Sequence, residues 1–513
     1  MGELTKRKKT AVAQASEEFA AVQSMGGRMH VRWDETAPVT PHGQLVYFAE
    51  FLATAGIFDE WVKSCPLSYS SPNASNVRDV LGTLMLGILA GSKRYAHIAG
   101  IRGDQVAAKA LGLSKIVSED SVRRGLKAME PTESSVWMDE ALRLSVVHAL
   151  ERPWILDLDA TIKTLYGHQE GAEVGYNPHK RGRPGHALHT YWIGNLRLVL
   201  DTQVCSGKQS SSGHAKPHLS DLLEGLGDKG PTLVRGDCGY GNQDIIEVCE
   251  RAGRRYLLRL RKTSNVRKLI ERAFNRDDWQ AAGQGWQARE DQLRLSGWSK
   301  ERRVVMLRRR IEGDVALVQK GASGQQVLAL GFNELQDEAR QLWEYTVLVT
   351  DAPYELGAIG QLYRDRCDCE NGFDELKNQW GWGGFTTKDL HRSELTARAV
   401  ALVYNWWSWY VRAANPKARR EALTSRPLLL SAVGRVTQTA GRVELHLTPM
   451  HAKVGLIKAM VANVQEAIRH VKKAAAEQLN KFDCWHALVR YISDKITGQT
   501  LLPTGPPVAL VGG

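Results

Sequence analysis

The sequence predicts an α/β protein in which a mixed sheet, flanked by helices, lies between two helical regions. Residues 151–261 contain short runs of alternating apolar and polar residues, typical of strands, in the order β-β-β-α-β-α-β. Residues 45–150 and 413–513 show apolar residues at helical spacing instead. Strands that alternate with helices after an antiparallel start indicate a mixed sheet with helices packed on it.

The bulk composition is that of a soluble globular protein. The 513 residues are 43% hydrophobic and 24% charged, and the length allows two to four domains. No apolar run approaches the ~18 residues of a membrane helix, and the basic N-terminus lacks the apolar stretch of a secretory signal. The seven cysteines contain no CxxC pair, which argues against a disulfide framework and a standard zinc motif. We therefore expect a cytoplasmic protein that contacts no membrane.

The first part of the chain is expected to bind DNA. Residues 1–44 are interpreted as a flexible basic tail, and residues 45–150 as a helical DNA-binding region. Within it, "SEDSVRRGLKAME" begins with Ser118 as a plausible N-cap and follows a helical run that ends in a glycine turn, an arrangement that resembles a helix-turn-helix. The basic residues of its second helix are Arg123, Arg124 and Lys127.

The sheet region begins at Trp154. "WILDLDATI", "HALHTYWIGN" and "LRLVLDTQVCSG" predict three strands of an antiparallel meander. A helix ("HLSDLLEGLG"), a strand ("PTLVRGD"), a helix ("NQDIIEVCERAG") and a strand ("RYLLRLR") follow. The loop "HKRGRPGHA" between the first two strands supplies three basic residues that we expect to track DNA, namely Lys180, Arg181 and Arg183.

Residues 262–343 interrupt the sheet pattern and read as a basic, β-rich insertion. From Arg251 to Arg310 there are 18 Lys or Arg and 6 Asp or Glu, a net charge of +12 that equals the excess of the whole chain. Such a local excess is usually a solvated face, but three interleaved tryptophans favour a nucleic-acid partner. We expect Trp298, in an exposed turn, to stack on a DNA base; the equal alternative for any one of these tryptophans is a place in the insertion's own small core. The sheet then resumes at "YTVLVTD", so residues 344–412 form its second part.

Acidic residues occur where strands and a late helix could present them together. Asp157 and Asp159 lie two apart on one strand face, Asp237 ends an apolar strand, and Glu370 lies on the helix. Alone, Asp237 would be read as a turn residue before Gly239. Three acids that converge from a strand, a strand end and a helix can hold two Mg²⁺ ions, which prefer oxygen ligands.

The segment "YRDRCDCENGFDELKNQW" reads as one helix with an unusual polar face. Tyr363, Arg366, Glu370 and Lys377 have offsets of 0, 3, 7 and 14, which place them on the same side of a helix. A core helix would carry an apolar stripe there. The pattern therefore indicates a binding or catalytic surface.

These motifs resemble the DDE transposases of bacterial insertion sequences. The four residues match the YREK signature position for position, "DAT" at Asp159 matches the first acidic motif, and "GDCGYGN" at Asp237 looks like the second. "DLDATIKTLYGHQEGAEVGYN" also looks like one subgroup of these elements. The resemblance covers roughly residues 154–410.

The resemblance implies an RNase H-like core with an insertion before the catalytic glutamate. Asp159, Asp237 and Glu370 would be catalytic and would ligate two Mg²⁺ ions, for which Mn²⁺ may substitute; Asp157 is the second choice for the first acid, because only Asp159 has the matching threonine two residues later. Tyr363, Arg366 and Lys377 would hold DNA phosphates.

The predicted function is cut-and-paste transposition. The protein would bind terminal inverted repeats, cleave at the transposon ends and join the 3′-hydroxyls to target DNA, as a homodimer on DNA in the bacterial nucleoid. The alternatives are an RNase H-like nuclease without strand transfer and a catalytically inactive DNA-binding derivative of a transposase.

Overall fold

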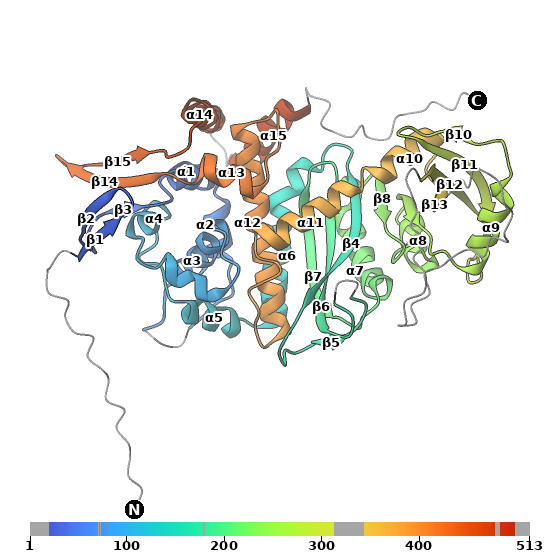
Figure 1. Ribbon diagram of the computed structural model, residues 1–513, viewed down its shortest axis with the longest axis horizontal. Coiled ribbons are helices and arrows are strands. Elements are labelled where there is room, and N and C mark those ends of the chain that lie inside the picture. The colour runs from blue at the N-terminus through green and yellow to red at the C-terminus, as the bar shows by residue number, and fades with distance from the viewer. Residues whose placement is uncertain are drawn as a thin grey trace, which may run out of the picture.

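The computed structural model describes residues 20–69, 71, 73–177, 180–311, 343–477 and 483–497. It is elongated, with helices and strand hairpins at one end, a sheet in the middle and a run of antiparallel strands at the other end (Figure 1). Among the described residues, none of the helices combines the length and apolar character needed to cross a membrane.

The N-terminal region is helical from Leu45 onward, as predicted. Its helices are α1 (Leu45–Ala55), α2 (Ile57–Lys63), α3 (Val77–Leu89), α4 (Gln105–Ala110), α5 (Glu119–Ala128) and α6 (Pro131–Val146), with 3₁₀ turns at Tyr95–Gly100 and Val147–Ala149. Ser118 is the N-cap of α5, as predicted, because its side chain accepts a hydrogen bond from the Ser121 amide at 3.2 Å.

The sheet strands lie where the alternating pattern predicts them. They are β4 (Ile155–Thr164), β6 (Pro184–Ile193), β7 (Leu198–Ser206), β8 (Leu233–Gly236) and β9 (Arg255–Arg259), with helices α7 (Ser211–Leu226) and α8 (Gln243–Arg251), the short β5 (Glu173–Val174) and a 3₁₀ turn at Gly227–Lys229. The spatial order is β7-β6-β4-β8-β9. The first three strands are antiparallel, and β4, β8 and β9 run parallel.

The region interpreted as an insertion extends this same sheet. After α9 (Ser264–Phe274) come β10 (Gln280–Ala281), β11 (Trp286–Leu293) and β12 (Arg302–Arg310), and β13 (Trp343–Thr350) then pairs with both β12 and β9. All four strands continue the central sheet beyond β9, giving ten strands in total. Residues 312–342 of the predicted insertion lie outside the described residues.

The C-terminal part is not helical throughout, which corrects the prediction for residues 413–513. Its helices are α10 (Leu356–Arg364), α11 (Cys367–Gln379), α12 (Leu390–Ala414), α13 (Ala422–Leu429), α14 (Val454–Glu477) and α15 (Cys484–Thr497). Between α13 and α14 lies a hairpin of β14 (Val433–Thr439) and β15 (Arg442–Thr448). It pairs with β3 (Val39–Thr40), far away in sequence. This long-range pairing supplies hydrogen bonds to strands whose side chains are largely exposed. Because these strands have no buried face, the sequence shows no local apolar pattern that would predict them.

The interpretation of residues 1–44 as a flexible tail is wrong for its second half. Residues 20–31 form a hairpin of β1 (Ala20–Ser24) and β2 (Gly27–Val31), and β3 follows. Residues 1–19 lie outside the described residues.

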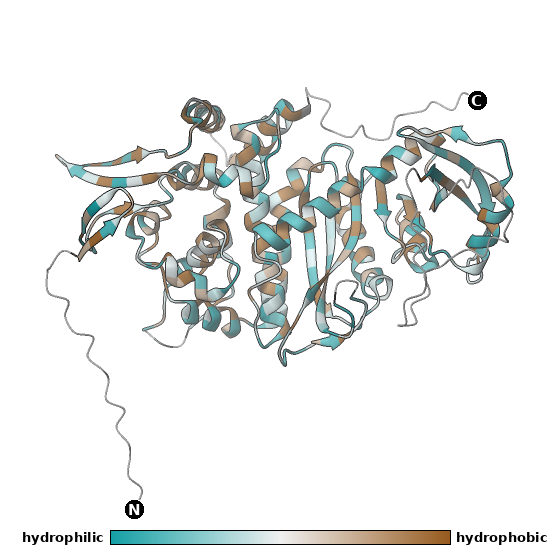
Figure 2. Ribbon diagram, in the orientation of Figure 1, coloured by the Kyte–Doolittle hydropathy of each residue, from teal (hydrophilic) through white to brown (hydrophobic). Residues whose placement is uncertain are grey.

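Helix α12 joins the N-terminal helices to the sheet. Its Trp406, Trp407 and Trp409 are each at most 1% exposed, as expected of core residues. The Phe48 ring of α1 meets the Trp407 ring edge to face at 5.3 Å, and α12 also packs on β7. Hydrophobic positions run through both the sheet and the surrounding helices (Figure 2). The helical region and the sheet therefore share one core.

Candidate active site

Two of the three predicted acids lie against one arginine. Asp159 is on β4 with its side chain 16% exposed, and Glu370 is near the start of α11 with its side chain 65% exposed. The guanidinium of Arg366 bridges them: Nη2 lies 3.0 Å from Asp159 Oδ2, and Nη1 lies 3.5 Å from Glu370 Oε1. The first strand and the late helix thus meet at this arginine.

The third acid comes from the neighbouring parallel strand. Leu158 of β4 is in register with Gly236 of β8, so the next residues, Asp159 and Asp237, lie side by side where β8 ends. Asp237 Oδ1 accepts a hydrogen bond from the Gly239 amide at 2.8 Å, the turn interaction that this residue alone would suggest. The turn and the register together present its carboxylate beside Asp159.

The pKa of Asp159 responds to the other two carboxyl groups. Burial raises the pKa of Asp159 to about 6, and the negative charges of Asp237 and Glu370 add to the rise, whereas Arg366 opposes it. Like charges that raise a neighbour's pKa are typical of a site arranged to receive a cation.

Metal binding is expected to weaken below about pH 6. In the metal-free protein Asp159 is protonated below its pKa of about 6, and a neutral carboxyl is a poor ligand, so protons compete with the metal. The apparent Mg²⁺ affinity should fall by roughly tenfold per pH unit below 6 and change little above 7. Isothermal titration with Mg²⁺ from pH 5 to 8 measures this. An affinity that stays constant over that range would contradict it.

The predicted single helix is in fact two helices that retain one functional face. Helices α10 and α11 meet at Asp365 and Arg366, which keep right-handed helical backbone angles. Burial raises the pKa of Tyr363, and the negative charge of Asp237 raises it further. Burial lowers the pKa of Lys377, and the negative charge of Asp159 opposes that shift. The break therefore leaves Tyr363, Arg366 and Lys377 each within the electrostatic influence of Asp159 or Asp237.

Asp157, the second choice for the first acid, is engaged elsewhere. It is 0% exposed and forms a bidentate ion pair with Arg235 of β8, with Nε–Oδ1 at 2.6 Å and Nη2–Oδ2 at 2.7 Å. Arg235 Nη1 also donates to the carbonyl of Leu362 on α10. The pair thus ties the sheet to the helix that carries Tyr363. Sequence reasoning missed Arg235, although an arginine inside the apolar strand "LVRGD" was a usable signal.

The acids fit divalent cations in ligand type. Carboxylate oxygens are the ligands that Mg²⁺ prefers. Among the described residues, two groups of three side chains have ligand atoms that all lie within 4.8 Å of one another, and these acids are not one of those groups. Carboxylate oxygens that are farther apart than the ligands of a single ion are compatible with two ions ~3.5–4 Å apart.

Helix α5 and the loop after β4, which carry six of the predicted DNA-binding residues, both contact the N-terminal end of α12. Arg123 of α5 is partly exposed, and its carbonyl accepts a hydrogen bond from Arg392 Nη1 at 3.4 Å. The loop after β4 reaches the same place, since the amide of Glu170 donates to the Lys388 carbonyl at 2.8 Å. Arg124, Lys127, Lys180, Arg181 and Arg183 are all exposed.

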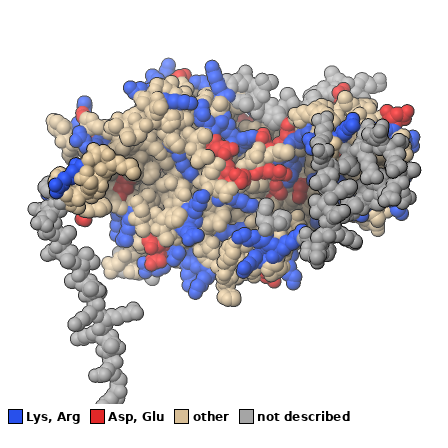
Figure 3. All heavy atoms as spheres, viewed as in Figure 1, with Lys and Arg blue, Asp and Glu red and all other residues tan. Residues whose placement is uncertain are grey.

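The charge distribution links this basic region to the acids. Figure 3 shows acidic side chains gathered over α11 in the middle of one face, with basic side chains around them. Leu165, the first residue of the loop after β4, lies six positions beyond Asp159, which is ~20 Å of extended chain.

Trp298 is not exposed, which corrects the prediction. It is 6% exposed and packs in the main hydrophobic core, with the Arg302 guanidinium 5.2 Å from its ring centre. Many arginines of the same region are paired internally, for example Arg289 with Asp278 at 2.7 Å and Arg303 with Glu290 at 2.7 Å. The formal charge of the region thus overstates what it offers to a polyanion.

The chain is similar to a family of transposase domains and to a solved transposase structure. The family described as "Transposase DDE domain group 1" matches residues 37–469. Among solved structures, the cryo-EM structure of a piggyBac transposase synaptic complex with hairpin DNA matches at 10% sequence identity, over 91% of this chain and 87% of that chain, with a TM-score of 0.35. No curated protein matches.

Proposed function

Because the chain belongs to the family of transposase DDE domains of group 1, we propose that it is a cut-and-paste DNA transposase. It would bind terminal inverted repeats, cleave at the transposon ends and join the 3′-hydroxyls to target DNA. The observation that carries the proposal is the meeting of Asp159 and Glu370 on Arg366, with Asp237 next to Asp159 on the parallel strand.

We further propose that residues 151–261 and 344–412 form an RNase H-like core. The strand order β7-β6-β4-β8-β9 supports this, because three antiparallel strands are followed by two that are parallel to the first. Residues 45–150 would bind DNA, residues 262–343 would be an elaboration of the sheet edge, and residues 413–513 would support the N-terminal helices. The DNA-bound protein would be a homodimer in the bacterial cytoplasm.

Asp159, Asp237 and Glu370 would hold divalent cations, which we propose to be Mg²⁺. When bound, such ions supply activation of a water or hydroxyl and stabilisation of a leaving oxygen. Arg366 would keep Asp159 and Glu370 charged and oriented. Tyr363 and Lys377, which lie within the electrostatic influence of these acids, would donate hydrogen bonds to phosphate oxygens and so place the scissile phosphate.

The test uses the full chain with labelled DNA of the element's ends, a target plasmid and Mg²⁺. A transposase yields both cleaved ends and joined products. Cleaved ends without joined products would support a nuclease without strand transfer. Specific binding without cleavage in Mg²⁺ or Mn²⁺ would support an inactive DNA-binding derivative.

The basic face of α5 should dominate binding to the DNA ends. Replacing Arg123, Arg124 and Lys127 together by Ala should weaken end binding and reduce the slope of log K against log salt by up to about 3, because each phosphate contact releases about one counterion. Fluorescence anisotropy at 50–200 mM salt measures both effects.

The control and the choice of protein follow from the structure. Lys473→Ala removes an exposed lysine, paired with Glu477 at 3.9 Å on α14, and should leave the slope unchanged. The full chain is used because residues 45–150 share their core with α12, so a fragment ending at residue 150 would lack that packing. An unchanged salt slope in the triple variant would show that α5 does not contact DNA.

A further inference from the structure

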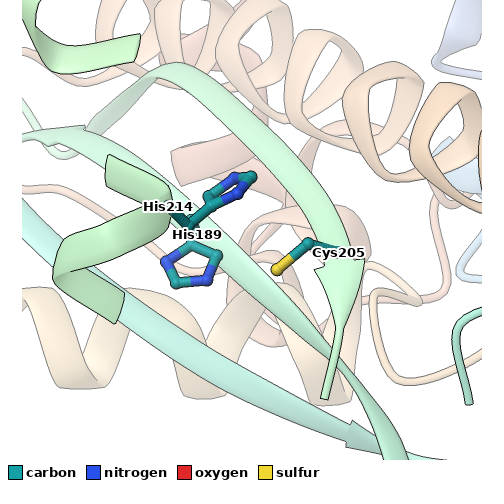
Figure 4. A group of neighbouring side chains, drawn as sticks. All are labelled: His189, Cys205 and His214. Carbon is teal, nitrogen blue, oxygen red and sulfur yellow. The ribbon is translucent and has the colours of Figure 1, made fainter. Parts of the chain in front are cut away.

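Three side chains that can bind metals converge on the face of the sheet covered by α7. His189 comes from β6, Cys205 from β7 and His214 from α7, and one ligand atom of each lies within 4.8 Å of those of the other two (Figure 4). His189 is in register with Gln203, two residues before Cys205. His189 and Cys205 therefore point to the same face of the sheet, and His214 approaches them from the helix.

This group lies apart from the acids. His189 is in register with Ala160 and Thr190 with Asp159, so His189 and Asp159 point to opposite faces. The link between the two places is Tyr240, in the turn after Asp237, whose hydroxyl lies 3.5 Å from His189 Nδ1.

Each imidazole of the group has one nitrogen without a partner. His189 is 1% and Cys205 5% exposed, and the Nε2 atoms of His189 and His214 are buried without a hydrogen-bond partner. Leaving a buried polar atom unpaired costs about 1–3 kcal/mol, and native interiors contain few such atoms. Burial lowers the pKa of His189 to about 3 and also lowers that of His214.

We propose that His189, Cys205 and His214 bind one zinc ion. Two imidazole nitrogens and one thiolate suit Zn²⁺ and not Mg²⁺, and a fourth position would take water. Zinc bonds of about 2.0–2.3 Å place tetrahedral ligand atoms ~3.3–3.8 Å apart, so the ligand atoms, now within 4.8 Å of one another, would close by no more than about 1.5 Å. Binding would convert the Cys205 thiol to a thiolate and release one proton.

The ion would link three elements of the fold. It would join β7 and α7 to β6, while the Tyr240 hydroxyl would accept a hydrogen bond from His189 Nδ1 and orient the ring. Because Tyr240 lies three residues after Asp237, the site would also steady the turn that presents that acid. The zinc proposal does not depend on the proposed transposase function.

The test is metal analysis of the full chain. After dialysis against Zn²⁺ with excess Mg²⁺ to occupy the carboxylates, we expect one zinc per chain by mass spectrometry. With Co²⁺ in place of zinc, we expect a thiolate-to-cobalt charge-transfer band. Cys205→Ala should lose the band and weaken zinc binding at least about 100-fold. His214→Gln, on the partly exposed helix face, serves if Cys205→Ala does not fold.

Two controls make the result specific. Cys249→Ala removes an equally buried cysteine of α8 and should keep both the zinc and the band. The second group of described residues whose ligand atoms lie within 4.8 Å of one another, His148, Glu151 and His486, contains no cysteine. Zinc that persists in Cys205→Ala or His214→Gln but disappears in His486→Ala would overturn the proposal, as would an unchanged chain that binds no zinc.

Discussion

Asp159→Asn, Asp237→Asn and Glu370→Gln are each expected to reduce cleavage of transposon-end DNA at least about 1000-fold, which corresponds to ~4 kcal/mol of transition-state stabilisation. Each change removes a charged oxygen ligand while keeping the size of the side chain. Binding to the DNA ends should stay within about twofold, because phosphate contacts by basic residues supply most of that affinity. Cleavage is followed on denaturing gels and binding by anisotropy.

A matched acid on the same helix is the control. Asp374 is exposed on α11 and accepts a hydrogen bond from Asn378 at 2.6 Å. Asp374→Asn should therefore cleave normally. Normal cleavage by any of the three acid variants would remove that residue from the proposed metal site. Circular dichroism should show that all variants fold, since Arg366 retains one carboxylate partner when either Asp159 or Glu370 is changed.

Asp157→Ala is expected to destabilise the protein by about 3–5 kcal/mol, the range for breaking a buried ion pair by removing one partner. The change would leave the Arg235 guanidinium, 2% exposed, without a counter-charge inside the sheet. It would also loosen the hold of Arg235 on the Leu362 carbonyl, and so on the helix that carries Tyr363. The measurement is the shift of the urea midpoint at pH 7.

The double variant Asp157→Leu with Arg235→Met tests whether Asp157 stabilises the fold as an ion-pair partner or acts as a metal ligand. Apolar side chains of similar volume often replace a buried ion pair at little cost, so stability should largely return, and with it cleavage. If Asp157→Ala instead keeps its stability but loses cleavage, Asp157 and not Asp159 is the first metal ligand.

Local patterns were sufficient for much of the fold and for the candidate acids. The alternation in "WILDLDATI" and the helical spacing of "NQDIIEVCERAG" predict β4 and α8, because each pattern reports which side of one element is apolar. The spacing of Tyr363, Arg366, Glu370 and Lys377 survives the break between α10 and α11, since the backbone there stays helical. Register then brings Asp237 beside Asp159, as the order of the strands suggested. The metal and DNA roles of these residues remain predictions.

What covers a residue was decided by the tertiary structure alone. Asp157 and Asp159 lie on one face of one strand. Asp157 pairs with Arg235 of β8, 78 positions away in sequence, and is therefore a buried ion-pair partner, whereas Asp159 remains the candidate metal ligand. Trp298 follows a glycine turn that reads as exposed, yet it packs into the core.

His189, Cys205 and His214 are separated by 16 and 9 residues and match no zinc motif, because a strand register and a helix packing bring them together. Periodicity along a chain encodes which face of an element is apolar. The partner that meets that face depends on contacts between residues far apart in sequence, and those contacts are set by the packing of the whole chain.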